Sequence, residues 1–541
     1  MATSSRHGLI EGPRDLGFGA MRRSLGICTA FATAFCLLCA VAHVSAAEQT
    51  TPEQRTAQEL ESLRSEPLLL RDFLFRMPKG ADLHLHLTGA TYAEQHIAAA
   101  AEDGLCVDPI AKSFTRSQPV HAGAEWQPVC EEGDVPASSV PANPSLYNAL
   151  IDSFSMRGFV PSEGATGHDH FFEAFTKFGG TDPRHLGEWL DVVAARAARQ
   201  NVQYLEVMAT PTWNRLNTIT KDIAWREDLG ALRQELLAKG LTQDIEAGKQ
   251  FWAAIDATRQ EREHCGTASE APACKVEVRY IYQVFRNAPK EVVFAAALFG
   301  FELASADPRV AGINLVGQED AHSSMTDYAE HMRMIGFLRE LYPHVHVSLH
   351  AGELTEGLVP PDWLCCHIRM AVEEANTDRI GHGTDIMYED DPASLMKKMA
   401  DKGILVEIAL TSNDDVLGTR EKNHPFPLYR KFAVPVALAT DDEGIERIDL
   451  TNEYVRAVKD YGLTYADLKQ IVRNNLEYGF LPGTSLWDGA AFQRVVPDCR
   501  SDALGGASPS ATCAAFLKGS EKASQQWELE RRFATFEAGR P

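Results

Sequence analysis

Histidines and carboxylates recur along this 541-residue chain in short groups that could bind a metal. His84 and His86 are separated by one residue, and later groups are His350-Ala351-Gly352-Glu353, Gly381-His382-Gly383 and Thr440-Asp441-Asp442. On a β-strand, residues two apart point to the same face, so both imidazoles of the first pair can reach one ion. A single histidine pair such as His84 and His86 is commonly structural. Several independent histidines and acids in one chain are harder to explain as packing, because burying unpaired ionisable groups is costly.

The chemistry that these groups could perform is metal-assisted hydrolysis. Several neutral imidazoles with one carboxylate suit zinc, whereas magnesium and calcium prefer oxygen ligands, so zinc is expected and iron is the alternative. Bound zinc activates water for attack, and a carboxyl group with a raised pKa in a desolvated pocket can donate a proton to the substrate. We expect Glu353 to be that acid.

Eight short apolar segments, rich in β-branched residues, must position these groups. They are 81–87, 202–208, 276–285, 310–316, 344–350, 379–382, 404–410 and 434–440. Amphipathic stretches at 289–304, 325–341, 363–375 and 392–402 alternate with them, as in a parallel sheet with helical crossovers. The sequence therefore predicts an α/β fold, a (β/α)8 TIM barrel, and the reactive groups lie at the C-terminal ends of segments, where this fold builds its active site.

The chain outside this alternation predicts insertions and terminal extensions. The connections after the first and second segments are longer than a crossover helix needs, and the Pro/Gly/Ser-rich stretch 103–167 indicates a loop insertion that could cover the barrel mouth. We expect a helical segment at 48–76, a barrel at 77–485 with an insertion at about 103–170, and an extension at 486–541. Helices are expected at 452–461, 465–480 and 521–536. His168 and His170 are expected to be solvated loop histidines, and the alternative is that they reach the ribose or the rim of the site.

Residues 1–47 have the pattern of a signal peptide. Met21-Arg22-Arg23 precedes an apolar run from Leu25 to Ala42, and the small residues that follow favour cleavage near Ala46-Ala47 over a retained membrane anchor. The protein is therefore expected to be secreted or periplasmic, without stable membrane insertion after cleavage. Its formal net charge of −23 repels phosphate backbones, so nucleic acid is not an expected partner.

Cysteine usage agrees with export. Eight of the 11 cysteines lie beyond the signal segment, and six of them form pairs close in sequence: Cys106 with Cys130, Cys265 with Cys274, and Cys499 with Cys513. We predict that these pairs form disulfides. Cys365 and Cys366 are adjacent and need not be oxidised, and a zinc-thiolate site is disfavoured because no C-x-x-C remains after the signal segment.

Two further motifs complete the set, Met77-Pro78-Lys79 before the first histidine pair and Ser412-Asn413 after the seventh segment. In order and spacing, the whole set resembles the adenosine deaminase family of metallo-dependent hydrolases over roughly 67–482. The insertions, cysteines and signal peptide are most similar to its secreted branch, the adenosine deaminase-related growth factors and their bacterial relatives.

The resemblance implies a role for each matching residue. It implies one zinc ion per chain, with the ligands His84, His86, His350 and Asp441. It implies that Glu353 protonates purine N1, that His382 takes a proton from the attacking water, and that Asp441 also belongs to the catalytic groups. For the purine it implies contacts from Asp442 to N7 and from the Gly317 N–H to N3, with His86 beside the substrate.

The activity that the resemblance implies is hydrolytic deamination of adenosine and 2′-deoxyadenosine to inosine and 2′-deoxyinosine, with release of ammonia. Thr88 departs from the family pattern, in which many members carry an acidic residue that contacts the ribose 5′-hydroxyl, so recognition of the ribose stays open. The alternatives are a deaminase of another purine or of a 5′-modified adenosine, and, in a different class, a non-catalytic growth-factor-like binding protein. The expected partner is a small purine nucleoside, and a homodimer is among the open oligomeric states.

Overall fold

The computed structural model describes residues 50–116, 118–120, 127–211 and 215–539. The predicted signal peptide lies outside these residues. Within them, no helix is both long and apolar enough to cross a bilayer.

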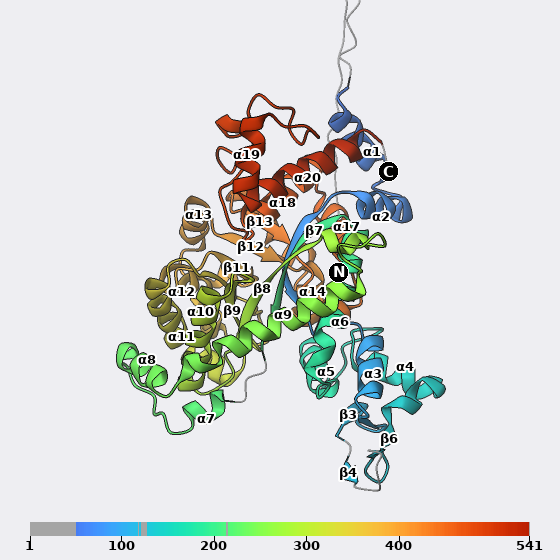
Figure 1. The fold of residues 1–541 in the computed structure, drawn as a ribbon, viewed down its shortest axis with the longest axis vertical. Helices are drawn as coiled ribbons and strands as arrows, with labels where there is room; N and C mark the ends of the chain where they lie inside the picture. The colour runs from blue at the N-terminus through green and yellow to red at the C-terminus, as the bar shows by residue number, and fades with distance from the viewer. Residues whose placement is uncertain (1–49, 117, 121–126, 212–214, 540–541) are drawn as a thin grey trace, which may run out of the picture. The chain divides into compact units, whose positions relative to one another are not determined.

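Eight parallel strands form the barrel predicted from the sequence (Figure 1). In spatial order they are β1 (Gly80–His86), β7 (Val202–Ala209), β8 (Glu277–Phe285), β9 (Val310–Val316), β10 (His346–Ala351), β11 (Arg379–His382), β12 (Leu405–Ile408) and β13 (Val436–Leu438). The barrel closes between its first and last strands, because the Asp441 N–H donates to the His84 carbonyl at 2.8 Å and the His86 N–H donates to the Asp441 carbonyl at 3.0 Å. The (β/α)8 prediction is confirmed, and closure places the first histidine pair beside the last acidic pair.

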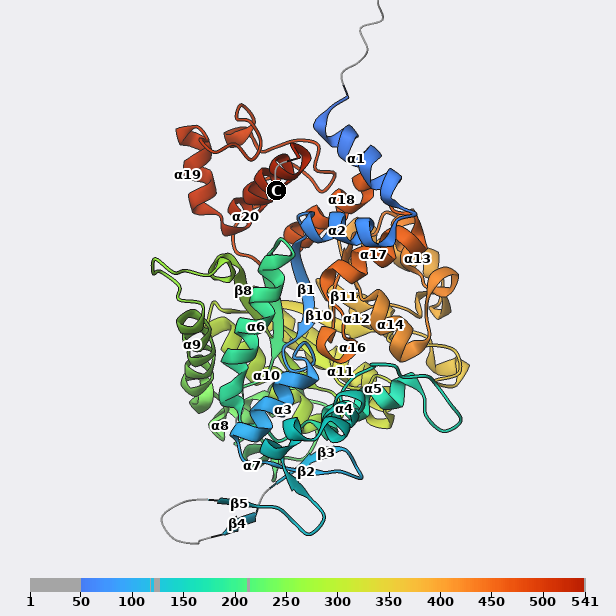
Figure 2. The same ribbon diagram turned by 90° about the vertical axis from the view of Figure 1, so that its right-hand side faces the viewer.

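Helices surround the barrel and bury its outer face (Figures 1 and 2). The helices outside the insertion and the two terminal regions are α6 (Leu186–Arg199), α7 (Leu216–Thr220), α8 (Leu229–Ala238), α9 (Ile245–Arg262), α10 (Lys290–Ala306), α11 (His322–Leu341), α12 (His367–Glu373), α13 (Pro392–Lys402), α14 (Leu410–Leu417), α15 (Phe426–Lys431), α16 (Glu443–Glu446), α17 (Leu450–Tyr461) and α18 (Tyr465–Glu477). The terminal helices are α1 (Pro52–Leu63), α2 (Pro67–Arg76), α19 (Ala511–Gly519) and α20 (Glu521–Glu537). Strand β7 is buried along its whole length, as expected for a parallel strand covered on both faces.

The insertion after β1 is more ordered than its composition indicates. It begins with α3 (Ala93–Glu102) and contains an antiparallel sheet of β2 (Cys106–Asp108), β3 (Ser113–Thr115) and β6 (Val135–Pro136), a pair of strands β4 (Gln118–Val120) and β5 (Gln127–Val129), and the helices α4 (Pro144–Ser153) and α5 (Gly167–Lys177). Its own apolar cluster includes Val107, Phe114 and Leu150. The predicted loop is therefore wrong for much of 103–167, because these apolar residues are too widely spaced among Pro and Gly to show a periodic pattern.

Disulfides join the three predicted cysteine pairs and also a fourth pair. Cys365 and Cys366, whose oxidation state the sequence left open, are bonded to each other. Cys366 takes a positive φ of 89° at the start of α12, a backbone state that the sequence does not reveal.

Peptide mapping without reduction should recover all four bridges from the exported protein. The three local loops close at low entropic cost, and a bridge persists in an oxidising compartment. Mass spectrometry of the digest, with a reduced sample as the control, tests this expectation. Free thiols at Cys106, Cys130, Cys265 and Cys274 would contradict both the pairing and the expectation of export.

Candidate active site

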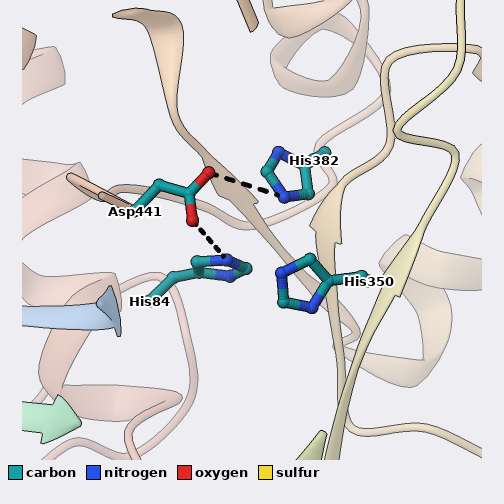
Figure 3. A group of neighbouring side chains, drawn as sticks. All are labelled: His84, His350, His382 and Asp441. Atoms are coloured by element: carbon teal, nitrogen blue, oxygen red, sulfur yellow. Dashed lines mark ion pairs between the residues drawn. The ribbon is translucent and has the colours of Figure 1, made fainter. Parts of the chain in front are cut away.

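Three predicted imidazole ligands and one carboxylate converge at the C-terminal mouth of the barrel. Figure 3 shows two of these imidazoles, His84 and His350, together with Asp441 and with His382, which lies in the same cluster. His84 Nε2 and His86 Nε2 lie 3.3 Å and 3.4 Å from Asp441 Oδ1. His86 Nε2 lies 3.2 Å from His350 Nε2. These residues come from β1, the end of β10 and the turn after β13. The structure thus brings together all four predicted metal ligands.

Each of the imidazoles of His84, His86 and His350 is oriented by a hydrogen-bond acceptor that contacts its Nδ1 atom. The Nδ1 contacts are His84 with Glu407 Oε2 at 2.6 Å, His86 with Gln283 Oε1 at 2.6 Å, and His350 with Asn314 Oδ1 at 2.8 Å. A neutral imidazole that donates from Nδ1 keeps a lone pair on Nε2, so three lone pairs would point toward a metal ion bound in this small region. Sequence reasoning missed these acceptors. Asn314 and Glu407 are each the single polar residue of an otherwise apolar strand, which is the signal that could have identified them. Gln283 lies on a strand that also carries Glu277 and Arg279, so it gives no such signal.

The donor set fits a zinc ion. His84 Nε2 is buried and has no hydrogen-bond partner in the described part of the chain, which is costly for a polar atom unless a ligand takes its lone pair. Neutral nitrogen donors with a carboxylate oxygen match the ligands that zinc prefers. His84, His86, His350 and Asp441 would hold the ion, which would activate a water molecule for attack.

Glu353 lies beside this cluster in a buried position. Its Oε1 is 3.8 Å from His382 Nε2, and the side chain is 8% exposed. Burial, and then the negative charge of Asp441, raise the pKa of Glu353 above its usual value. The carboxyl group therefore retains its proton to higher pH than an exposed glutamate, as a proton donor requires.

Glu319, which the sequence analysis missed, fixes the backbone that carries Glu353. It accepts the N–H groups of Gly352 and Glu353 at 3.0 Å and 2.8 Å, and His367 donates to it at 2.6 Å. Although burial alone would raise it, the charges of Arg286 and His367 hold the pKa of Glu319 down, at about 2. Glu319 is thus an anion at neutral pH that anchors the loop after β10.

A cavity of about 400 Å³ opens next to the cluster. The predicted substrate-binding residues His86, Thr88, Gly317 and Asp442 all line it, as does Glu353. Gly317 has a φ of 94°, and a Cβ atom there would lie 2.0 Å from Asn287 Oδ1, so the position requires glycine. A backbone N–H can consequently face the cavity without a side chain beside it.

Helix α5 of the insertion forms an aromatic wall of the same cavity. Phe171, Phe172 and Phe175 line it, and the sequence analysis did not identify them. His168, at the start of α5, is buried and lies 3.0 Å from Asp320 Oδ1, and His170 stacks on Phe159 at 4.4 Å. The expectation of solvated loop histidines is therefore wrong, because both lie on a helix that packs against the barrel.

Comparison with known proteins places this fold and site in a family. Residues 191–486 match the family described as adenosine deaminase. The chain belongs to the adenosine deaminase family. The match begins after β1, so His84 and His86 join the site through the closure of the barrel rather than through the matched residues.

Known family members share part of the chain with this protein. The adenosine deaminase of Clostridium perfringens is 30% identical over 175 residues, which cover 32% of this chain and 47% of the relative. The adenosine deaminase of Aliivibrio fischeri is 35% identical over 138 residues, covering 25% and 38%. The chain therefore matches about half or less of the length of these relatives.

Among solved structures, an amidohydrolase from Burkholderia ambifaria with bound Zn has a similar fold. Its TM-score is 0.51 at 18% sequence identity, and the alignment covers 87% of this chain and 95% of that one. At this identity the likeness supports the barrel architecture alone.

Proposed function

We propose that the protein hydrolytically deaminates adenosine and 2′-deoxyadenosine with one zinc ion per chain. The observation that carries this proposal is the convergence of the Nε2 atoms of His84, His86 and His350 with Asp441 Oδ1, at the wall of a cavity that Glu353, Gly317 and Asp442 also line. The family match and the relatives named adenosine deaminase support the same reaction.

The residues around the cavity can recognise a purine at three separate points. Glu353, with its raised pKa, would donate a proton to N1, which makes C6 more open to attack by water. The Gly317 N–H would donate to N3. Burial, and then the charge of Asp441, raise the pKa of Asp442 well above its usual value, so its protonated carboxyl would donate to N7. After attack at C6, one proton of the water is transferred to the amino group, which leaves as ammonia, and the other returns to Glu353.

The cavity favours a nucleoside over a nucleotide. Among residues that the structure describes, those lining the cavity include no lysine or arginine, while Phe171, Phe172, Phe175 and Phe285 give it an apolar wall. A phosphate needs cationic or multiple N–H donors to replace its hydration. We therefore expect adenosine to be a better substrate than AMP by about 10²-fold or more in kcat/KM, because the loss of a charged contact has an effect of this order.

A direct absorbance assay tests the proposed function. Purified protein would be mixed with adenosine, 2′-deoxyadenosine, adenine, AMP and a 5′-modified adenosine, and the conversion of the adenine ring followed in the ultraviolet. A preference for another purine would support the alternative deaminase, and no turnover of any purine by zinc-loaded protein would favour the non-catalytic binding protein.

Thr88→Asp should sharpen selectivity at the 5′ end of the nucleoside. Thr88 lines the cavity, and its hydroxyl group lacks the negative charge that a carboxylate offers to a ribose hydroxyl. In the wild type, 5′-deoxyadenosine should keep a larger share of the adenosine kcat/KM than in the variant. Equal ratios in the two proteins would show that Thr88 does not face the ribose.

We also propose that the protein is exported, to the periplasm or the medium. The disulfides within residues 52–541 support this location, because such bonds persist in oxidising compartments. N-terminal sequencing of the protein recovered from the medium or periplasm should give a start near Glu48. A cytoplasmic full-length chain would contradict it.

A further inference from the structure

A row of three buried polar side chains runs outward from the active site, behind His382. His382 ends β11, Asn413 lies in the first turn of α14, and His424 precedes α15. All three are at most 3% exposed. Neither Asn413 nor His424 lines the cavity, so their part in the chemistry must act through His382.

The outer end of the row is fixed by the backbone. The Phe426 N–H lies 3.1 Å from His424 Nδ1, and a backbone amide can only donate, so Nδ1 must offer its lone pair. Burial, and then the positive charge of Arg456, lower the pKa of His424 to about 3. A neutral imidazole with a free Nδ1 lone pair carries its proton on Nε2.

The direction of the next two bonds follows from the first. His424 Nε2 lies 3.0 Å from Asn413 Oδ1, and the amide must present its oxygen here, because the opposite rotamer would place two donors face to face. The amide nitrogen then faces inward and donates to His382 Nδ1, at 3.0 Å. Every bond in the row therefore points from the Phe426 backbone toward the active site.

We propose that His424 and Asn413 are positioning residues that hold neutral His382 with its proton on Nε2, as a hydrogen-bond donor to the oxygen that attacks the substrate. This inference rests on the proposed function for the identity of that oxygen. His382 Nε2 lies 3.8 Å from both Glu353 Oε1 and Asp441 Oδ2 and, in the described residues, has no hydrogen-bond partner. Its N–H is thus aimed between the two carboxyl groups.

This tautomer gives His382 a different role from the one implied by the family resemblance. A neutral ring whose Nε2 already carries a proton cannot accept another there while Asn413 donates to Nδ1. It can instead stabilise negative charge on the oxygen, in the way that preorganised donors do. Swapping the donor and acceptor at Asn413 should therefore impair the chemical step while leaving the fold nearly unchanged.

Nitrogen NMR of protein labelled with ¹⁵N-histidine reads the tautomer directly, without any substrate. In alkaline solution, the His382 signals, assigned by their loss in His382→Gln, should show a protonated Nε2 and an unprotonated Nδ1. Asn413→Asp is isosteric but only accepts, so the proton should move to Nδ1. A protonated Nδ1 in the wild type, or an unmoved proton in Asn413→Asp, would overturn the proposal.

Kinetics supply the second readout. Asn413→Asp and His424→Phe should lower kcat for adenosine by about 10²-fold, as loss of an aligned donor does, with KM changed much less. His424→Gln should restore most of the rate, because its amide can accept from Phe426 and donate to Asn413. The control is Asn148→Asp, the same change at an exposed position of α4, which should leave kcat unaltered.

The two readouts separate this inference from the proposed function. A correct tautomer in a protein that turns over no purine would refute deamination and leave the positioning intact. Full kcat in both variants with a moved proton would refute the catalytic role of the His382 N–H.

Discussion

Glu353→Gln should lower kcat for adenosine by on the order of 10²-fold or more, while the protein still binds metal and substrate. Glutamine keeps the size of the side chain and its hydrogen-bonding capacity but has no acidic proton to transfer to N1. Stopped-time assays for kcat, metal analysis, and binding of a non-reactive purine would be measured on the same preparation. Near wild-type turnover would mean that another group protonates the purine.

The pH dependence of kcat should also show the loss of the Glu353 proton donor. Because the pKa of Glu353 is raised, the proton-bearing form persists through neutral pH, and the rate of the wild type should fall only when pH rises through that raised pKa. The variant should lack this alkaline fall in kcat. Glu356→Gln is the matched control, because Glu356 is an exposed glutamate on the same loop and should leave both the rate and the profile unchanged.

Glu319→Gln should also lower kcat, because it disturbs the position of Glu353 and leaves the Glu353 proton in place. The variant therefore separates positioning from proton donation. Glu319 accepts two backbone N–H groups of the loop that carries Glu353, and it does not line the cavity. The single amide oxygen of glutamine can accept only part of these hydrogen bonds. The effect should therefore be smaller than for Glu353→Gln, and the alkaline fall in rate should remain.

The barrel could be predicted from the sequence because its signals are local. Most strands are short segments rich in apolar and β-branched residues, and observed bounds such as Arg379–His382 and Val310–Val316 coincide with the predicted segments. The reactive histidines follow from the same pattern, because the C-terminal ends of parallel strands meet at one rim. The pattern predicts the direction of each strand, and the strand directions place the predicted metal ligands at the same rim of the barrel.

The supporting residues could not be predicted, because their roles depend on contacts between distant segments. Glu407 meets His84 across 323 positions of sequence, and Asn413 meets His382 only through the turn that begins α14. The aromatic wall formed by α5 could not be predicted from composition, because Phe171 and its neighbours fit the pattern of a buried hydrophobic core equally well. The sheet within the insertion was missed for the same reason, as its apolar residues pair only after the fold forms.

Removal of zinc should abolish turnover, and Glu407→Gln should make the enzyme lose zinc more readily. The Glu407 carboxylate accepts from His84 Nδ1, and although burial alone would raise it, Arg379 and His84 hold the pKa of Glu407 down, at about 2. A charged acceptor makes the opposite imidazole nitrogen a stronger ligand, and loss of such a partner typically costs about 10- to 100-fold in metal affinity. Competition with a chelator of known affinity, followed by elemental analysis, measures that loss.

Glu206→Gln provides the control that isolates the metal effect from packing. Glu206 and Glu407 both pair with the buried guanidinium of Arg379, so either substitution removes one charge from the same ion-pair group. Both variants should therefore unfold at a lower temperature than the wild type. Only Glu407→Gln replaces the charged acceptor of His84 with a neutral amide, so it alone should need added zinc to recover activity. Equal zinc affinity in the two variants would show that the carboxylate acts on stability alone.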